Sequence, residues 1–314
     1  MKKLFIFPLL LLVAICAKAE EKGKVPIAVY FPEQVESIPR TSVNALSAKL
    51  ITALGQSEMG ASDDFAQFYL TCKAAVISRD VIPGAPPKYR QNVDLTFYVI
   101  DAFSQKIFNA FTLSTNGIGN SEAQAYIACF QKIQPSNKDL QNFLTETNNR
   151  ITTYYETQTD NIITTAQSLA KVNNYEEALF RLSQYPEVCS GYNRIVEAAT
   201  GIYAKYVQDK ANRDLAKARS IWNAGQNSVA AAEAGTYLAE IIPEASCYGE
   251  AVALWKEIKN TVKGDIEYER AVETRNSAYE QEATIANINA WKAVGVAFGN
   301  NQKADTYNRE IIVH

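Results

Sequence analysis

The apolar positions along the chain follow two different periods, and the change falls near residue 135. Before that point, segments with the period of two typical of strands alternate with segments of helical period. After it, apolar residues recur every three or four positions and no strand pattern returns. We therefore predict an α+β protein with a small α/β domain at 20–135 and an all-α domain at 136–314.

The first domain is predicted to have the order β-α-β-β-β-α. Strands are expected at 25–31, 65–82, 93–99 and 107–114, and helices at 39–55 and 121–133. The last two strands are joined by a turn at 101–106, which makes them a hairpin and the sheet mainly antiparallel. Asp101 begins this turn and is expected to accept hydrogen bonds from nearby backbone N–H groups, the alternative being a ligand-binding role at the sheet edge.

The second domain is predicted to be a helical-hairpin repeat between two long helices. The long helices are expected near 138–171 and 265–299, where the apolar pattern continues without interruption. Residues 173–206 and 226–262 are imperfect copies that each read helix, proline, acidic residue, cysteine, tyrosine, helix. A further helix near 209–223 is expected to pack between the two copies.

The chain begins with the pattern of an export signal, MKKLFIFPLLLLVAICAKA. Two lysines precede a short apolar stretch, and Ala17 and Ala19 are small residues of the kind that signal peptidase reads, which predicts a signal peptide at 1–19. Cys16 is an alternative lipidation site, although Ile15 stands where a small residue usually precedes such a cysteine. We expect an exported protein, periplasmic or outer-membrane-associated, with no transmembrane segment in the mature chain.

Charge and cysteine content narrow the classes of partner and site. The 31 basic and 34 acidic residues are interspersed and give a formal charge of −3, which argues against a nucleic-acid partner. No cysteine pair has the Cys-x-x-Cys spacing of zinc or redox sites. In an oxidising compartment Cys189 could pair with Cys247, and Cys72 with Cys129, the alternative being that they are small buried apolar residues.

The stretch STNGIGNSE, residues 114–122, begins like a phosphate-binding loop. A dinucleotide loop needs a third glycine and a parallel strand before it, whereas Glu122 stands three residues after Gly119 and the strand is expected to be antiparallel. We therefore predict a tight turn made with Gly117 and Gly119, followed by a helix that Asn120 or Ser121 caps. No cofactor is expected.

Catalytic side chains are scarce in this sequence. Its single histidine is His314, so nucleophilic triads and the usual zinc sites are not expected. A pair of carboxylates could still hydrolyse glycosides, but most acidic residues lie beside basic ones on helix faces, as in solvated ion pairs. We expect no catalytic residues, no metal site and no enzymatic activity.

Seventeen tyrosines, many of them in the helical half, are compatible with a binding surface or with packed helix seams. If they form a binding surface, we expect Tyr185, Tyr192 and Tyr248 to line a groove between the stacked hairpins.

Two parts of the chain resemble known families. Residues 93–133 read VDLTFYVIDAFSQKIFNAFTLSTNGIGNSEAQAYIACFQKI. This order of strand, turn, strand, Gly-x-Gly and alanine-rich helix resembles the small α/β module of bacterial envelope lipoproteins, such as the curli-secretion lipoprotein, over about residues 24–133. Residues 173–262 are similar to tetratricopeptide-type repeats, with Tyr175, Ala178 and Leu182 at matching positions. The first resemblance implies a non-catalytic assembly or binding domain, often lipid-anchored.

These observations predict an adaptor or assembly factor that binds another envelope protein through its helical domain. Two alternatives remain from the sequence. The long helices could make the protein a self-assembling structural component of a larger particle or appendage, and facing carboxylates could make it a carbohydrate-active enzyme.

Overall fold

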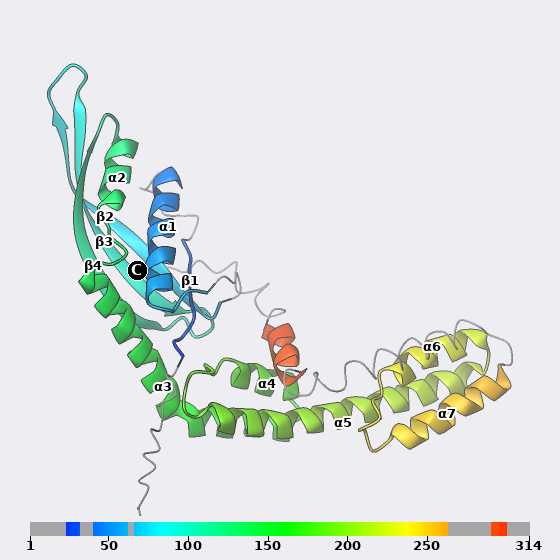
Figure 1. The fold of residues 1–314 in the computed structure, drawn as a ribbon. Helices are drawn as coiled ribbons and strands as arrows, with labels where there is room; N and C mark the ends of the chain where they lie inside the picture. Colours follow the sequence, from blue (N-terminus) through cyan, green and yellow to red (C-terminus); the bar gives the residue numbers. More distant parts are fainter. Residues whose placement is uncertain (1–22, 32–39, 62–65, 263–289, 300–314) are drawn as a thin grey trace, which may run out of the picture.

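The computed structural model describes residues 23–31, 40–61, 66–262 and 290–299. In these residues the chain is α+β, as predicted, with a sheet and its covering helices followed by an all-helical half (Figure 1). The first half contains the strands β1 (Ile27–Val29), β2 (Phe68–Ile82), β3 (Lys88–Asp101) and β4 (Ile107–Gly119), with the helices α1 (Arg40–Gln56) and α2 (Glu122–Gln131).

The sheet has the strand order β1-β2-β3-β4, and only the β1–β2 pair is parallel. Both α1 and α2 lie on one face, where Leu50 of α1 and Phe97 of β3 are fully buried. The opposite face carries a polar ladder, in which Thr96 and Thr112 share a hydrogen bond of 2.9 Å. Antiparallel sheets commonly leave one such face to solvent. Beyond the helices, β2 and β3 continue as a projecting hairpin (Figure 1).

The predicted glycine turn is wrong, because Gly117 and Gly119 lie inside β4. A Cβ atom at Gly117 would lie 2.6 Å from the backbone nitrogen of Cys129, and one at Gly119 would lie 2.5 Å from that of Ala125. Glycine inside a strand often marks such a close approach of two backbones. The two glycines therefore let α2 rest directly on β4. The predicted cap is confirmed, since the Ser121 hydroxyl accepts a hydrogen bond from the backbone N–H of Gln124 at 3.2 Å.

The helical half begins with the long helix α3 (Lys138–Lys171), at the predicted bounds and capped by Asn137. It continues with α4 (Tyr175–Ser183), α5 (Tyr192–Gly225), α6 (Ser228–Ala239) and α7 (Tyr248–Thr261). The separate helix expected near 209–223 is wrong, because α5 runs for 34 residues without a break. The second predicted long helix, 265–299, lies outside the described residues up to 289. Its last part is helical and is called helix 290–299 below.

The two predicted hairpins form matching units that share α5. The first unit consists of the end of α3, α4 and the start of α5, and the second of the end of α5, α6 and α7. Each first turn contains a left-handed residue, Asn173 or Gln226. Each second turn is anchored alike: Ser190 donates its backbone N–H to Glu156 at 2.9 Å, and Ser246 donates its own to Gln208 at 2.8 Å. Because the 34-residue helix α5 belongs to both units, the repeat is longer than a hairpin of two short helices would be.

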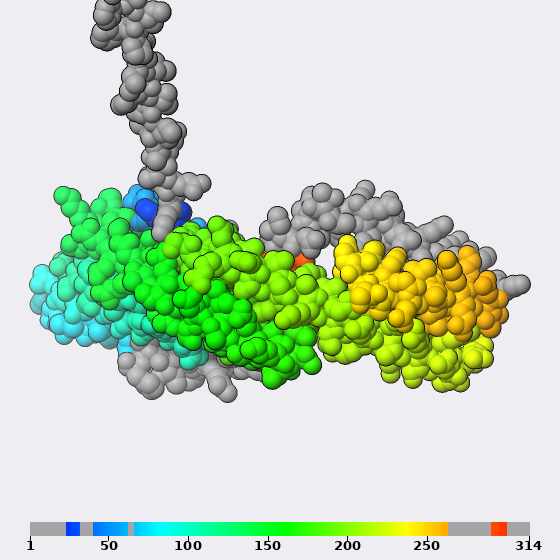
Figure 2. Space-filling view, turned by 90° about the horizontal axis from the view of Figure 1, so that it is seen from below, coloured from blue at the N-terminus to red at the C-terminus, as the bar shows by residue number. Residues whose placement is uncertain are grey.

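Two hydrophobic cores run through the elongated molecule. The first extends from the sheet through α3 and α4 to the start of α5, so it does not end at residue 135, where the secondary structure changes. The second lies between the end of α5, α6 and α7. Figure 2 shows α6 and α7, in yellow and orange, at the opposite end of the molecule from the cyan strands.

All four cysteines of the described chain are buried, and Cys72, Cys129 and Cys247 are free thiols, so neither predicted disulfide is formed in the structure. Cys189 belongs to the first core and Cys247 to the second, which separates that pair. Cys72 and Cys129 both lie in the first core, and each thiol contacts a backbone oxygen instead, of Lys73 and Gln91 respectively. The four cysteines therefore match the alternative interpretation, which is that they are small buried apolar residues.

The contact of α2 with β4 predicts that Gly117→Ala destabilises the protein by about 2 kcal/mol, because the added methyl group must push two backbones apart. Gly201→Ala is the matched control, since a Cβ atom at this position in α5 meets nothing within 4 Å. The control should raise stability by about 0.5–1 kcal/mol, as alanine does in a helix interior. Urea unfolding measures both changes. Equal stabilities of the two variants would contradict the close packing.

Candidate functional site

A buried polar cluster joins the sheet to the helical half. The carboxylate of Asp101, which is 2% exposed, accepts hydrogen bonds from the backbone N–H groups of Phe103 and Ser104 at 2.9 and 3.3 Å. This confirms the predicted turn. The hydroxyl of Tyr155 in α3 donates to the same carboxylate at 2.8 Å and accepts a hydrogen bond from Gln67 at 2.7 Å. Asp101 therefore fixes the β3–β4 turn and α3 to each other.

An aromatic contact extends this cluster into the helical repeat. The ring of Tyr155 packs edge-on against Phe68 in the sheet, at 6.1 Å between centroids, and against Tyr185 at 5.8 Å. The hydroxyl groups of Tyr185 and Thr159 are 2.8 Å apart. Tyr185, which the sequence placed in a partner-binding groove, is only 2% exposed in this structure. It packs inside the protein, where its hydroxyl group needs an internal hydrogen bond.

A surface beside this cluster is occupied by a helix from much later in the chain. We call it the α4 surface and define it by Leu179, Phe180, Glu187 and Tyr192. Helix 290–299 lies against it, drawn in red beside α4 in Figure 1. The contact joins residues 105 positions apart in the sequence, since the amine of Lys292 binds the carboxylate of Glu187.

The close approach of helix 290–299 to α4 depends on two glycines. A Cβ atom at Gly295 would lie 2.8 Å from the carbonyl carbon and oxygen of Leu179. A Cβ atom at Gly299 would lie 2.7 Å from the Cδ2 atom of the Phe180 ring. These glycines are four residues apart and share one helix face. Any larger side chain at Gly295 would have to displace the backbone of α4.

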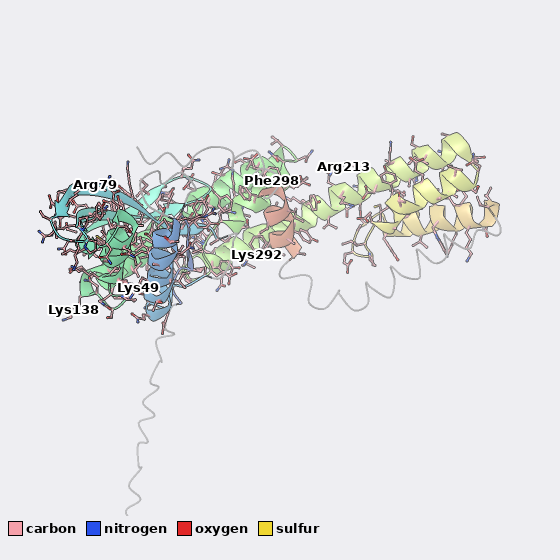
Figure 3. The ribbon with its side chains drawn as sticks, turned by 90° about the horizontal axis from the view of Figure 1, so that it is seen from above. Lys49, Arg79, Lys138, Arg213, Lys292 and Phe298 are labelled. Carbon is pink, nitrogen blue, oxygen red and sulfur yellow. The ribbon has the colours of Figure 1, made fainter. Side chains whose placement is uncertain are left out.

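Aromatic and charged side chains complete the contact, one before the glycine pair and one between its two members. Phe298 packs on the ring of Phe180 with 5.8 Å between centroids. Lys292 lies at the other end of the helix from Phe298 (Figure 3), and its amine lies over the ring of Tyr192, 5.2 Å from the ring centroid. Partial burial disfavours the charged amine, but hydrogen bonds to Glu187 and Tyr192 outweigh it and raise the pKa of Lys292.

The contact leaves buried polar atoms without hydrogen-bond partners. Trp291 is 1% exposed, and its indole Nε1 has no acceptor within the described part of the chain. At the end of α4, the buried Oε1 atom of Gln184 likewise has no donor. An unpaired buried polar group costs about 1–3 kcal/mol. Burying the Trp291 ring is favourable, but the unpaired N–H group removes part of that gain.

This surface could be predicted from the sequence only in part. Tyr192 lies on it, half-buried, as one of the predicted partner-binding residues. Tyr248 is half-buried at the start of α7 and packs against the second core, so its role stays a prediction. The available signal was the spacing Gly-x-x-x-Gly at residues 295–299, which commonly marks helices in close contact.

A second candidate is a depression of about 330 Å³ between β4 and α2. It lies where the Gly-x-Gly stretch had suggested a phosphate site. Its lining supplies one amine, three side-chain amides and apolar groups, from Lys88, Ile118, Gly119, Asn120, Gln124, Ile127, Ala128 and Gln131. These residues include no carboxylate or thiol, so the depression lacks the pair of groups that acid–base catalysis by carboxylates requires.

Metal-binding clusters and membrane-spanning helices can be assessed only in the described part of the chain. Within residues 23–31, 40–61, 66–262 and 290–299, no cluster of three or more His, Cys, Asp or Glu side chains is placed to bind a metal ion. Over those same ranges, every helix is too short or too polar to cross a membrane.

Comparison with known proteins gives only distant similarities. No family model matches the chain. No curated protein matches it either. Among solved structures, a minor lipoprotein from Acinetobacter baumannii is 17% identical, with a TM-score of 0.25, over 41% of this chain and 92% of that one. A provisionally assigned lipoprotein from Caulobacter crescentus CB15 is 15% identical, with a TM-score of 0.22, over 40% of this chain and 83% of that one. Neither similarity is high enough to assign a family.

Tyr155→Phe is expected to destabilise the protein by about 1.5–3 kcal/mol, because it removes a hydrogen bond to a buried carboxylate. Tyr98→Phe, on the open face of the sheet, is the control and should change stability by less than about 0.5 kcal/mol. Urea unfolding at pH 7 measures both changes. If Tyr155→Phe were as stable as Tyr98→Phe, the hydrogen bond between Tyr155 and Asp101 would contribute nothing to the stability of the protein.

The same variant should reveal a dependence on alkaline pH. Burial and the nearby Asp101 carboxylate raise the pKa of Tyr155 well above its ordinary value of 10.0. The tyrosine of the unfolded chain ionises first, so the stability that Tyr155 contributes is complete below pH 10 and declines as the pH rises above it. The stability difference between the wild type and Tyr155→Phe should therefore narrow above pH 10. A constant difference up to pH 11 would contradict this.

Lys292→Glu should release helix 290–299, because it places two carboxylates together at Glu187. Hydrogen exchange of the amides at 290–299 should become at least about tenfold faster, since a helix this short is marginal without packing. The double variant Lys292→Glu with Glu187→Lys restores opposite charges and should recover most of the protection. Protection that is unchanged in the single variant would show that the ion pair does not hold the helix.

Proposed function

We propose that this protein is an exported, non-enzymatic adaptor or assembly factor that binds another envelope protein through its helical half. The observation that carries the proposal is the α4 surface, where Leu179, Phe180, Glu187 and Tyr192 hold a separate helix through glycine, aromatic and charged contacts. Binding an amphipathic helix on such a surface is a common mode of protein recognition.

The arrangement of the fold supports this use of the helical half. The buried cluster of Asp101 and Tyr155 fixes α3 to the sheet, and α3 in turn packs against α4. The α4 surface is therefore presented on rigid elements, which limits the conformational entropy lost when a partner binds. The second unit, with α6 and α7, extends the molecule away from the sheet and offers further surface (Figure 2).

The proposed location rests on the sequence. Two lysines, the apolar stretch at 4–15 and the small residues Ala17 and Ala19 form the pattern of an export signal. An envelope location would place the helical half where envelope proteins are assembled, and the resemblance of residues 24–133 to modules of envelope lipoproteins agrees with that location. Lipidation of Cys16 would additionally anchor the protein to a membrane.

In-cell photocrosslinking tests the proposal. A photoreactive amino acid is placed at Val229 on α6 or at Val172 after α3, which are 74% and 73% exposed, and at Thr112 on the open sheet face as the control. We expect one dominant envelope protein crosslinked from the helical positions and at least about fivefold less from Thr112. Mass spectrometry of the crosslinked product identifies it.

Two outcomes would contradict the adaptor proposal. Crosslinks only between copies of this chain would identify it as a self-assembling component. Crosslinks to a partner only from Thr112 would place the binding surface on the sheet and leave the helical half as a scaffold.

A further inference from the structure

We propose that the α4 surface binds a helical segment of the partner in place of helix 290–299, so that the chain carries its own competitor for the site. The partner helix is defined by chemistry: two small residues four positions apart, an aromatic residue directly before the second of them, and a lysine or arginine three positions before the first. This inference rests on the proposed function and adds to it the kind of ligand and the way in which access is limited.

The small residues follow from the backbone of α4. Gly295 lies so close to the carbonyl group of Leu179 that a Cβ atom would be 2.8 Å away, and the face of Phe180 is equally close to Gly299. A helix can lie this near only if the residues at both contacts are glycine or nearly as small. The surface therefore selects the spacing small-x-x-x-small, as closely packed helix pairs do.

The flanking residues follow from the two ends of the surface. Glu187 supplies a carboxylate and Tyr192 an aromatic ring, and both interact with the single amine of Lys292. A cation is favoured at such a position by charge pairing and by the face of the ring. At the other end, the ring of Phe180 packs between Phe103 and Phe298, which favours an aromatic ligand residue.

Helix 290–299 fits the surface but is an imperfect ligand. Among the residues that the structure describes, the buried indole Nε1 of Trp291 has no hydrogen-bond acceptor, so docking the helix removes that N–H group from water without replacing the bond. A partner with phenylalanine at this position would avoid the loss. The outer residue Val296 is 47% exposed, so the helix is held on one side and is not enclosed.

The covalent connection gives helix 290–299 its advantage over a free helix. It belongs to the same chain as the α4 surface, so its binding is intramolecular and does not depend on protein concentration, whereas the binding of a free helix does. A partner helix must exceed this competition by binding more tightly or by contacting other parts of the protein at the same time. Unrelated helices of similar shape therefore do not displace helix 290–299 from the α4 surface.

Peptide binding to the full-length mature chain tests this inference. The probe is a fluorescent peptide of residues 288–300, and fluorescence anisotropy measures its dissociation constant. Gly295→Leu in the chain removes the tethered competitor but leaves the α4 surface intact, because the new side chain would collide with Leu179. We expect this variant to bind the peptide at least about tenfold more tightly than the wild type does. Val296→Leu, on the outer side of the helix, is the matched control and should behave like the wild type.

Changes in the peptide test the chemistry of recognition. The Gly295→Leu peptide should bind neither chain. The Trp291→Phe peptide should bind the Gly295→Leu chain at least as tightly as the wild-type peptide, because it lacks the unpaired N–H group. The Lys292→Glu peptide should bind weakly unless the chain also carries Glu187→Lys, which reverses the partner charge. This charge-reversed pair also tests the site if Gly295→Leu prevents folding, which circular dichroism would show.

The inference is overturned if the folded Gly295→Leu chain binds the peptide no better than the wild type, or if the Gly295→Leu peptide binds equally well. It is also overturned if wild-type chains form dimers that the peptide dissociates, because the occupant would then be a second copy. These failures remain separate from those of the proposed function. An envelope protein crosslinked from Val229 would keep the adaptor proposal even if no peptide binds at α4.

Discussion

The hydrogen bond between Tyr155 and Asp101 is the interaction on which the arrangement of this protein depends. It is formed between a turn of the sheet and the middle of a 34-residue helix, in a place that excludes water. A carboxylate buried there must be satisfied, and it is, by two backbone N–H groups and the tyrosine hydroxyl. The direction in which α3 leaves the sheet, and hence the position of every later helix, follows from this contact and from the aromatic packing around it.

From this joint the first core continues into the helical repeat without a boundary. Phe68, Tyr155 and Tyr185 pack in succession from the sheet to the turn after α4. The α4 surface is built on that turn, and its ring of Phe180 contacts Phe103 in the β3–β4 turn. The surface that we propose for binding therefore belongs to the junction of the two halves, which gives the sheet domain a part in shaping it.

At two places in the protein, a pair of glycines allows a helix to lie close against a neighbouring element. In the sheet domain, Gly117 and Gly119 remove side chains so that α2 can lie on β4. In the helical half, Gly295 and Gly299 do the same for helix 290–299 on α4. The two cases differ in what surrounds them. The first packs against the core of the sheet domain, with Gly117 buried, whereas the second is flanked by a partly exposed ion pair and leaves an indole N–H group unpaired within the described residues. This difference is the reason for treating the second contact as exchangeable.

The sequence by itself determined the fold class, the order of the strands and helices in the first domain and the bounds of α3, because hydrophobic periodicity and capping residues act over short distances. It also indicated the role of Asp101 in its turn and the two copies of the hairpin. It could not show that α5 belongs to both copies, because an uninterrupted helix and two helices in close succession have the same apolar period.

Tertiary structure alone decided how distant segments meet. The pattern at the glycines of β4 predicts a turn, because nothing local reveals a helix lying on a strand. Tyr185 and Tyr192 have similar local patterns, yet packing buries Tyr185 against Tyr155 and leaves Tyr192 beside Lys292. Cys189 and Cys247 occupy matching turns, but they lie apart because each turn belongs to a different core. Contacts such as Lys292 with Glu187 join residues 105 positions apart, and periodicity carries no information over that distance.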